Sequence, residues 1–90
     1  MSNYYLTVLV KNDFDEKERK ELFESIKKNF AKLSKEDLWG SRDLTYPIKH
    51  NEKAFYAHFE FEGEPSKIPS LDKSLKLNED ILRYLLLKVK

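Results

Sequence analysis

Residues 55–61 alternate between apolar and polar side chains along their whole length. Phe55, Ala57, Phe59 and Phe61 fall on one side of an extended strand, and the residues between them fall on the other. Strict alternation is typical of a strand with one face on a core and one face outside it. The chain therefore needs a second layer that covers one side of a sheet.

Three other short runs are expected to form strands. Tyr4–Val10, Leu38–Tyr46 and Ile81–Val89 are rich in β-branched, aromatic or other apolar side chains. Pro47 follows the second of these runs and lacks the N–H group that a sheet ladder needs. We therefore expect four strands in all.

Two helices are expected between the strands. The first spans Asp15–Leu33, begins with Asp15 and Glu18 at capping-box spacing, and has Phe14 ahead of it as a possible hydrophobic staple. Its apolar stripe consists of Leu22, Phe23, Ile26, Phe30 and Leu33. The second helix is shorter, and its stripe consists of Ile68, Leu71 and Leu75.

The resulting order, β-α-β-β-α-β, predicts an α+β ferredoxin-like fold in a single domain over residues 1–90. We expect a four-stranded antiparallel sheet with the first and third strands at its centre. Right-handed crossovers place both helices on one face, which leaves the other face open.

The open face should carry Tyr5, Thr7 and Leu9 of the first strand, because Leu6 and Val8 are assigned to the core. The third strand should add Tyr56, His58 and Glu60. The last strand is apolar on both sides, since Leu82, Tyr84 and Leu86 alternate with Leu85, Leu87 and Val89. An edge strand of this kind indicates a partner-binding surface, with Tyr56, His58, Leu85 and Leu87 as candidates. The alternative is an ordinary apolar surface strand, or a bulge that turns both sets inward.

Charge and composition limit the possible functions. The net charge is only +1, so any nucleic-acid contact must come from a local basic cluster. There is no cysteine, which excludes disulfides and thiolate chemistry and fits a reducing cytosol. We expect no membrane segment, no secretory signal, no metal, no cofactor and no small-molecule substrate.

The segment that reads Leu-Trp-Gly-Ser-Arg-Asp-Leu-Thr-Tyr-Pro-Ile-Lys, residues 38–49, is the most distinctive motif in the chain. It resembles the second-strand pattern W-G-x-R-x-L-A-Y-P-I of the ribosomal protein S-six family, the sixth protein of the bacterial small ribosomal subunit. The matching residues are Trp39, Gly40, Arg42, Leu44, Tyr46, Pro47 and Ile48. Asp43 stands where a basic residue is common in the family, Thr45 replaces the usual alanine, and the turn over residues 51–54 lacks the glycine often found there.

The resemblance implies a structural protein of the cytoplasmic ribosome. It also implies binding to the central domain of small-subunit ribosomal RNA, together with ribosomal protein S-eighteen as partner. The candidate RNA-binding residues are Tyr4, Arg42, Lys49, His50, Lys53 and Arg83. Cations at these positions could contact phosphates, and Tyr4 could stack on a base or donate its hydroxyl.

Other functions of the same fold are less well supported by the sequence. An acylphosphatase-like enzyme needs a glycine-rich loop with arginine after the first strand, and residues 11–14 contain neither. Residues 53–59 faintly echo an RNA-recognition module, but Phe55 and Phe59 are assigned to the core side. A protein-interaction adaptor that uses the open sheet remains an alternative. Trp39 is interpreted as a packing residue on an edge strand, with a base platform as the second possibility.

Overall fold

The computed structural model describes residues 2–12, 15–48 and 51–89. The regular elements, in chain order, are β1 (Ser2–Lys11), α1 (Glu16–Lys27), β2 (Lys32–Ile48), β3 (Asn51–Gly63), the 3-10 turn η1 (Pro65–Lys67), α2 (Ile68–Leu77) and β4 (Ile81–Val89).

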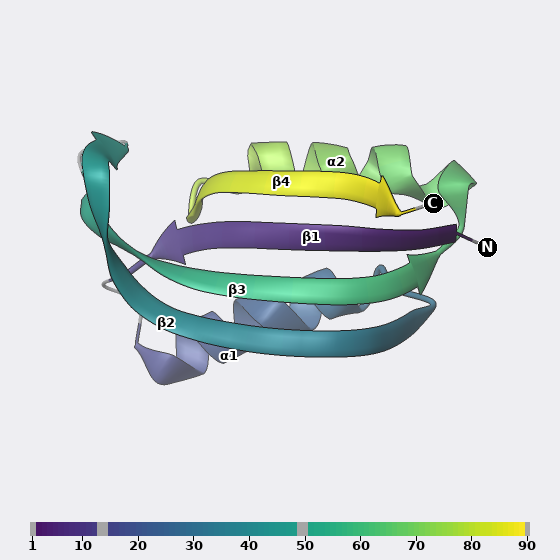
Figure 1. Ribbon diagram of the computed structural model, residues 1–90, viewed down its shortest axis with the longest axis horizontal. Helices are drawn as coiled ribbons and strands as arrows, with labels where there is room; N and C mark the ends of the chain where they lie inside the picture. Colours follow the sequence, from purple (N-terminus) through teal and green to yellow (C-terminus); the bar gives the residue numbers. More distant parts are fainter. Residues whose placement is uncertain (1, 13–14, 49–50, 90) are drawn as a thin grey trace.

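The strands form one antiparallel sheet in the order β2-β3-β1-β4. Figure 1 looks onto the open face of this sheet, with α1 and α2 both lying behind it. The predicted α+β ferredoxin-like fold is therefore confirmed, including the central position of β1 and β3. Neither helix within the described part of the chain is long and apolar enough to cross a membrane.

The start of α1 agrees with the sequence, but its end does not. The Asp15 carboxylate accepts a hydrogen bond of 2.8 Å from the backbone N–H of Glu18, which satisfies one of the free donors at the helix start. The helix ends at Lys27 rather than at Leu33. The Asn29 side chain donates to backbone oxygens in the last turn and closes the helix end.

The sequence placed Phe30 and Leu33 in the helical stripe, and this was wrong. Phe30 lies in the connection after α1, where its ring stacks on Phe61 with centroids 3.8 Å apart. Leu33 already belongs to β2 and pairs with Phe61 of β3. The spacing of Phe30 and Leu33 fits a helical period, but the chain is no longer helical there. The backbone N–H of Ala31 bonds to the carbonyl of Glu62, so pairing with β3 has already begun. The proposed staple residue, Phe14, lies outside the described residues.

The core lies between the sheet and the two helices. Its largest fully buried side chains come from the helix side of the sheet and from α2: Phe59, Phe61, Leu6, Leu71, Val8 and Val10. Phe23 of α1 packs edge-on against Phe59, with 5.7 Å between ring centroids. The alternation of residues 55–61 therefore predicted the buried face correctly.

A partly buried hydrogen bond joins α2 to β4. The Tyr84 hydroxyl donates to the Asp72 carboxylate over 2.5 Å. Burial, aided by this bond, raises the pKa of Tyr84 to about 12. The same bond from Tyr84 lowers the pKa of the Asp72 carboxyl.

Tyr84→Phe is expected to lower the thermal unfolding midpoint by a few degrees at neutral pH, because it removes this bond. The raised pKa of Tyr84 makes its contribution full below the ordinary tyrosine value and lost as pH rises toward about 12. The lowered pKa of Asp72 makes its contribution present above the ordinary aspartate value and lost as pH falls below it. Thermal melts from acid to alkaline pH should show the two proteins converging at both extremes. A constant difference at every pH would contradict this account.

Candidate functional site

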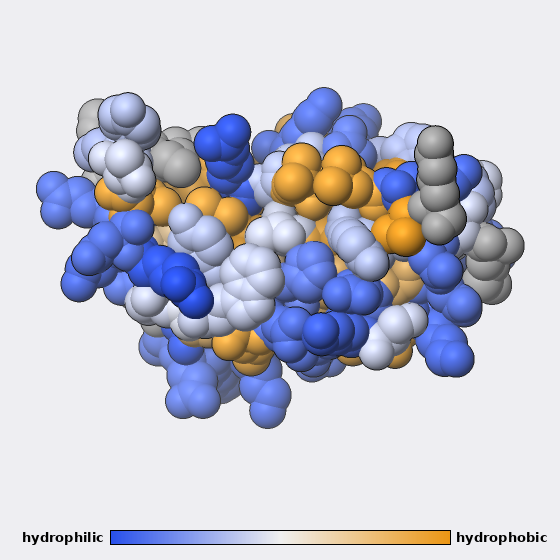
Figure 2. All heavy atoms as spheres, in the orientation of Figure 1, coloured by the Kyte–Doolittle hydropathy of each residue, from blue (hydrophilic) through white to orange (hydrophobic). Residues whose placement is uncertain are grey.

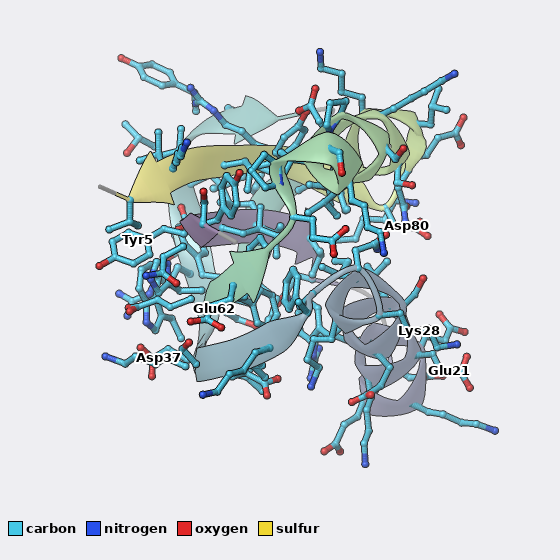
Figure 3. The ribbon with its side chains drawn as sticks, turned by 90° about the vertical axis from the view of Figure 1, so that its right-hand side faces the viewer. Tyr5, Glu21, Lys28, Asp37, Glu62 and Asp80 are labelled. Atoms are coloured by element: carbon cyan, nitrogen blue, oxygen red, sulfur yellow. The ribbon has the colours of Figure 1, made fainter. Side chains whose placement is uncertain are left out.

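The open face of the sheet carries the residues that alternation assigned to it. Cross-strand pairs place Tyr5 opposite Glu60 and Leu87, and Thr7 opposite His58 and Leu85. Figure 3 shows Tyr5 and Asp37 pointing away from both helices, into the space in front of the sheet. No helix or strand of the described residues covers this face (Figure 1).

One half of the open face, over β4 and β1, is mostly apolar, with Arg83 on the same face of β4. Leu85 is 57% exposed and Leu87 is 50% exposed, and Tyr5 lies beside Leu87. We call these three residues the β4 patch. Apolar side chains gather over β4 in the space-filling view (Figure 2). The opposite side of β4 faces the core, since Leu82 is buried and Leu86 packs against the core cluster. The prediction that β4 is apolar on both sides is therefore confirmed.

His58 lies at the centre of the open face and is held by its neighbours. Its Nδ1 is 2.9 Å from the Thr7 hydroxyl, and its Nε2 is 3.2 Å from the Glu60 carboxylate. The Tyr5 ring contacts it edge-on, with centroids 5.6 Å apart. Only 15% of the His58 side chain is exposed. His58 can therefore fix the shape of this surface, and it offers a partner little area of its own.

Trp39 lies on the open face, next to a bulge in β2. The register shifts between Leu38, which pairs with Ala57, and Gly40, which pairs with Tyr56. Gly40 has a φ of +87°, a conformation that favours glycine. The extra residue, Trp39, stacks in parallel on His58 with centroids 5.4 Å apart and 9° between the planes. Trp39 is still 45% exposed, so its predicted packing role accounts for only part of its surface.

The predicted cations occupy different parts of the molecule. Arg83 on β4 pairs with Leu9, and Arg42 on β2 pairs with Ala54 on the same face. Both arginines are exposed, and they lie on the two opposite edge strands of the sheet. Lys53 is on the β2–β3 hairpin, with its Nζ 3.9 Å from the Asp43 carboxylate. Lys49 and His50 lie outside the described residues.

The same hairpin extends past the rest of the sheet. β1 ends at Lys11, opposite Ala54, while β2 and β3 continue to pair as far as Ile48 and Asn51. In Figure 1 this end of the hairpin curls away from the sheet. Tyr46 on this extension is 78% exposed.

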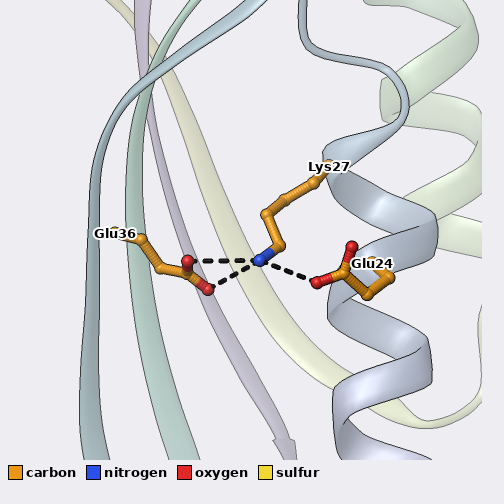
Figure 4. A network of polar contacts seen from close by, with 3 residues as sticks. All are labelled: Glu24, Lys27 and Glu36. Atoms are coloured by element: carbon orange, nitrogen blue, oxygen red, sulfur yellow. Dashed lines mark hydrogen bonds and ion pairs between the residues drawn. The ribbon is translucent and has the colours of Figure 1, made fainter.

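A separate cleft lies on the helix side, between α1 and the edge strand β2. Figure 4 shows Lys27 between Glu24 and Glu36, with its Nζ 3.1 Å and 3.0 Å from their carboxylate oxygens. Burial alone would lower the pKa of Lys27, but the hydrogen bonds to Glu36 and Glu24 outweigh it, and the pKa is raised. These contacts join α1 to β2. Because both carboxylates are used within the network, we assign it a structural role.

No group of three side chains capable of holding a metal ion occurs among the described residues. The open face instead presents rings, aliphatic side chains and guanidinium groups. Such an arrangement suits docking to a macromolecule.

The family model described as Ribosomal protein S6 matches residues 3–88. The chain belongs to the ribosomal protein S6 family. The small ribosomal subunit protein bS6 of Corynebacterium aurimucosum is 35% identical, over 98% of this chain and 96% of the relative. The bS6 protein of Dictyoglomus turgidum is 31% identical, over 96% of this chain and 93% of the relative.

A solved structure agrees with the fold. The crystal structure of 30S ribosomal protein S6 from Thermotoga maritima matches with a TM-score of 0.90 at 22% identity, over 98% of this chain and 87% of that one. Membership of the S6 family confirms the resemblance that the motif at residues 38–49 indicated. The family is structural rather than enzymatic, which confirms the prediction that the chain is not an enzyme.

The structure corrects one expectation about Tyr4, a candidate RNA-binding residue. Its side chain is 5% exposed and its ring stacks on Phe61, with centroids 5.6 Å apart. Tyr4 shares the parity of Leu6 and Val8 and points toward the helices, so the expectation of an open ring for base stacking was wrong. A contact between its hydroxyl and RNA stays a prediction.

Proposed function

We propose that this S6-family chain is a structural component of the small subunit of the cytoplasmic ribosome. In this role it binds the central domain of small-subunit ribosomal RNA together with ribosomal protein S-eighteen. The names of its relatives, small ribosomal subunit protein bS6, support the assignment to the subunit. The open face supports the two kinds of contact.

The division of the open face is the observation that carries this proposal. The β4 patch offers aliphatic area without charge, and burial of such area is the main favourable contribution to protein association. Trp39, Tyr56 and Arg42 on the β2 side combine rings with a cation, which suits an RNA strand. One face can therefore hold a protein and an RNA side by side.

The low net charge predicts that this chain alone binds RNA weakly. With a charge of +1, the chain lacks the basic excess that gives tight non-specific RNA binding. A partner protein that covers the β4 patch could contribute its own contacts to the RNA. The RNA affinity of the pair should then exceed that of either protein alone.

Reconstitution tests this proposal directly. We expect the chain to bind a central-domain RNA fragment weakly alone, and far more tightly when ribosomal protein S-eighteen is present. The logarithm of the binding constant should fall with the logarithm of salt concentration, as it does when phosphate contacts release counterions. Absence of a complex at low salt with both proteins present would refute the proposal. RNA binding that is absent while the two proteins still associate would favour the adaptor alternative.

The double variant Arg42→Ala with Arg83→Ala is expected to weaken RNA binding without unfolding the domain. Both side chains are exposed and can pair with phosphate oxygens. Loss of two phosphate contacts should reduce affinity about 100-fold at low salt and lower the salt slope by about 1.4 to 1.8. Filter binding over a salt series, with a thermal melt as the folding control, provides the measurement. An unchanged slope would remove both arginines from the RNA site.

A further inference from the structure

The open face has a shallow, wide-open hollow of about 380 Å³ on its β2 side, lined by Trp39, Arg42 and Tyr56. It shares no residue with the β4 patch, whose two leucines lie on the opposite edge strand of the sheet. Its walls are two aromatic rings and one guanidinium group. The β4 patch, in contrast, consists of leucine side chains and a tyrosine ring.

The rings are fixed before any ligand arrives. Trp39 stacks on His58, and the two ring nitrogens of His58 are held by Thr7 and Glu60. Tyr56 lies with its ring centroid 6.5 Å from that of Trp39 and 28° between the planes. A platform that is already ordered loses little conformational freedom when a flat group stacks on it.

Arg42 provides charge complementarity for an anion. The neighbouring Lys53 faces a carboxylate, since its Nζ is 3.9 Å from Asp43. No carboxylate among the described residues lies within ion-pair distance of Arg42. Its guanidinium group therefore remains available to a phosphate beside the rings.

We propose that this hollow binds one unpaired nucleotide of RNA, with its base stacked on Trp39 and its phosphate paired with Arg42. The inference rests on the proposed function and assigns to this chain a single-nucleotide site within the RNA contact. A nucleotide combines a flat, apolar-faced ring with a neighbouring negative charge, and the hollow presents the complement of both. A protein segment would match the aliphatic β4 patch better.

The chain offers a direct reporter, because Trp39 is its only tryptophan. We expect a short unstructured adenine-rich RNA oligonucleotide to quench the Trp39 emission with saturation. An oligonucleotide of equal length and charge that lacks bases should leave the emission unchanged. Arg42→Ala should weaken the quenching about tenfold, which is the loss of one charge-assisted phosphate contact. Equal quenching by both oligonucleotides, or none by either, would overturn the site.

Variants extend the test to the assembled complex. Trp39→Leu should weaken binding of the central-domain RNA in the presence of ribosomal protein S-eighteen by about tenfold or more, and Trp39→Phe should restore most of it. Tyr46→Leu is the control, since it removes an exposed ring of the same strand outside the hollow. A thermal melt of each variant separates loss of binding from loss of folding.

The outcomes separate this inference from the proposed function. If Trp39→Leu binds the RNA and partner as tightly as the parent chain, the nucleotide site is overturned while the ribosomal function stands. If the emission of Trp39 changes on addition of ribosomal protein S-eighteen alone, the hollow is a protein contact and the inference is also overturned. Failure of the parent chain to join any complex would overturn the proposed function itself.

Discussion

Replacement of Leu85 by aspartate is expected to weaken binding of ribosomal protein S-eighteen by about 100-fold or more. Leu85 is 57% exposed in the free chain and lies at the centre of the β4 strand. Covering a leucine side chain contributes about 1.5 to 3 kcal/mol, and an unpaired carboxylate in its place adds a desolvation cost. Titration calorimetry with the purified partner measures the loss.

The stability of the free chain should change little in the same variant. An exposed strand position tolerates aspartate at a cost of less than about 1 kcal/mol. Leu77→Asp is the matched control, because Leu77 is also an exposed leucine but lies at the end of α2. It should leave partner binding unchanged. If unfolding accounts for the whole loss at Leu85, or if both variants lose binding equally, the β4 patch is not the partner site.

Phe59→Ala is expected to lower the free energy of unfolding by about 3 to 5 kcal/mol. The Phe59 ring is fully buried and contacts Phe23 and Phe30, with ring centroids 5.7 Å and 5.9 Å away. Its removal leaves a cavity between α1 and the central strand β3. Since small domains are stable by only about 5 to 15 kcal/mol, this variant should lose a large fraction of its stability. Urea unfolding followed by circular dichroism measures the effect.

Tyr46→Ala provides the reference for that measurement. Tyr46 is highly exposed on the hairpin, so its truncation should change the free energy of unfolding by no more than about 0.5 kcal/mol. A loss below about 1 kcal/mol for Phe59→Ala would show that the core closes around the gap. It would also contradict the view that the aromatic rings on β3 anchor α1.

Alternation along the chain was sufficient to predict the two faces of the sheet. Leu6, Val8 and Phe59 are buried, while Tyr5 and Leu85 are open, as the pattern requires. The reason is physical: successive strand residues point to opposite faces, and only one face has helices to cover it. The candidate partner residues on β4 followed from the same rule, although their role stays a prediction.

The end of α1 and the bulge next to Trp39 could not be obtained in this way. Phe30 and Leu33 fit a helical period, and nothing local in the sequence shows that pairing with β3 begins at Ala31. The register shift at Gly40 places Arg42 on the same open face as Trp39. A glycine inside a strand was the available signal for that bulge. Tyr4 is buried like Leu6, whose parity it shares, and the family pattern gave no signal of this.

The absence of cysteine from the sequence permits the most direct test of the central claim, that the open sheet face and not the helix layer docks in the assembled complex. Leu87→Cys places one thiol on the β4 patch, and Leu77→Cys places one on α2. The alkylation rates of both thiols are compared in the free chain and in the complex with ribosomal protein S-eighteen and central-domain RNA. The account predicts strong protection at position 87 and an unchanged rate at position 77. Protection at position 77 with free reaction at position 87 would contradict it.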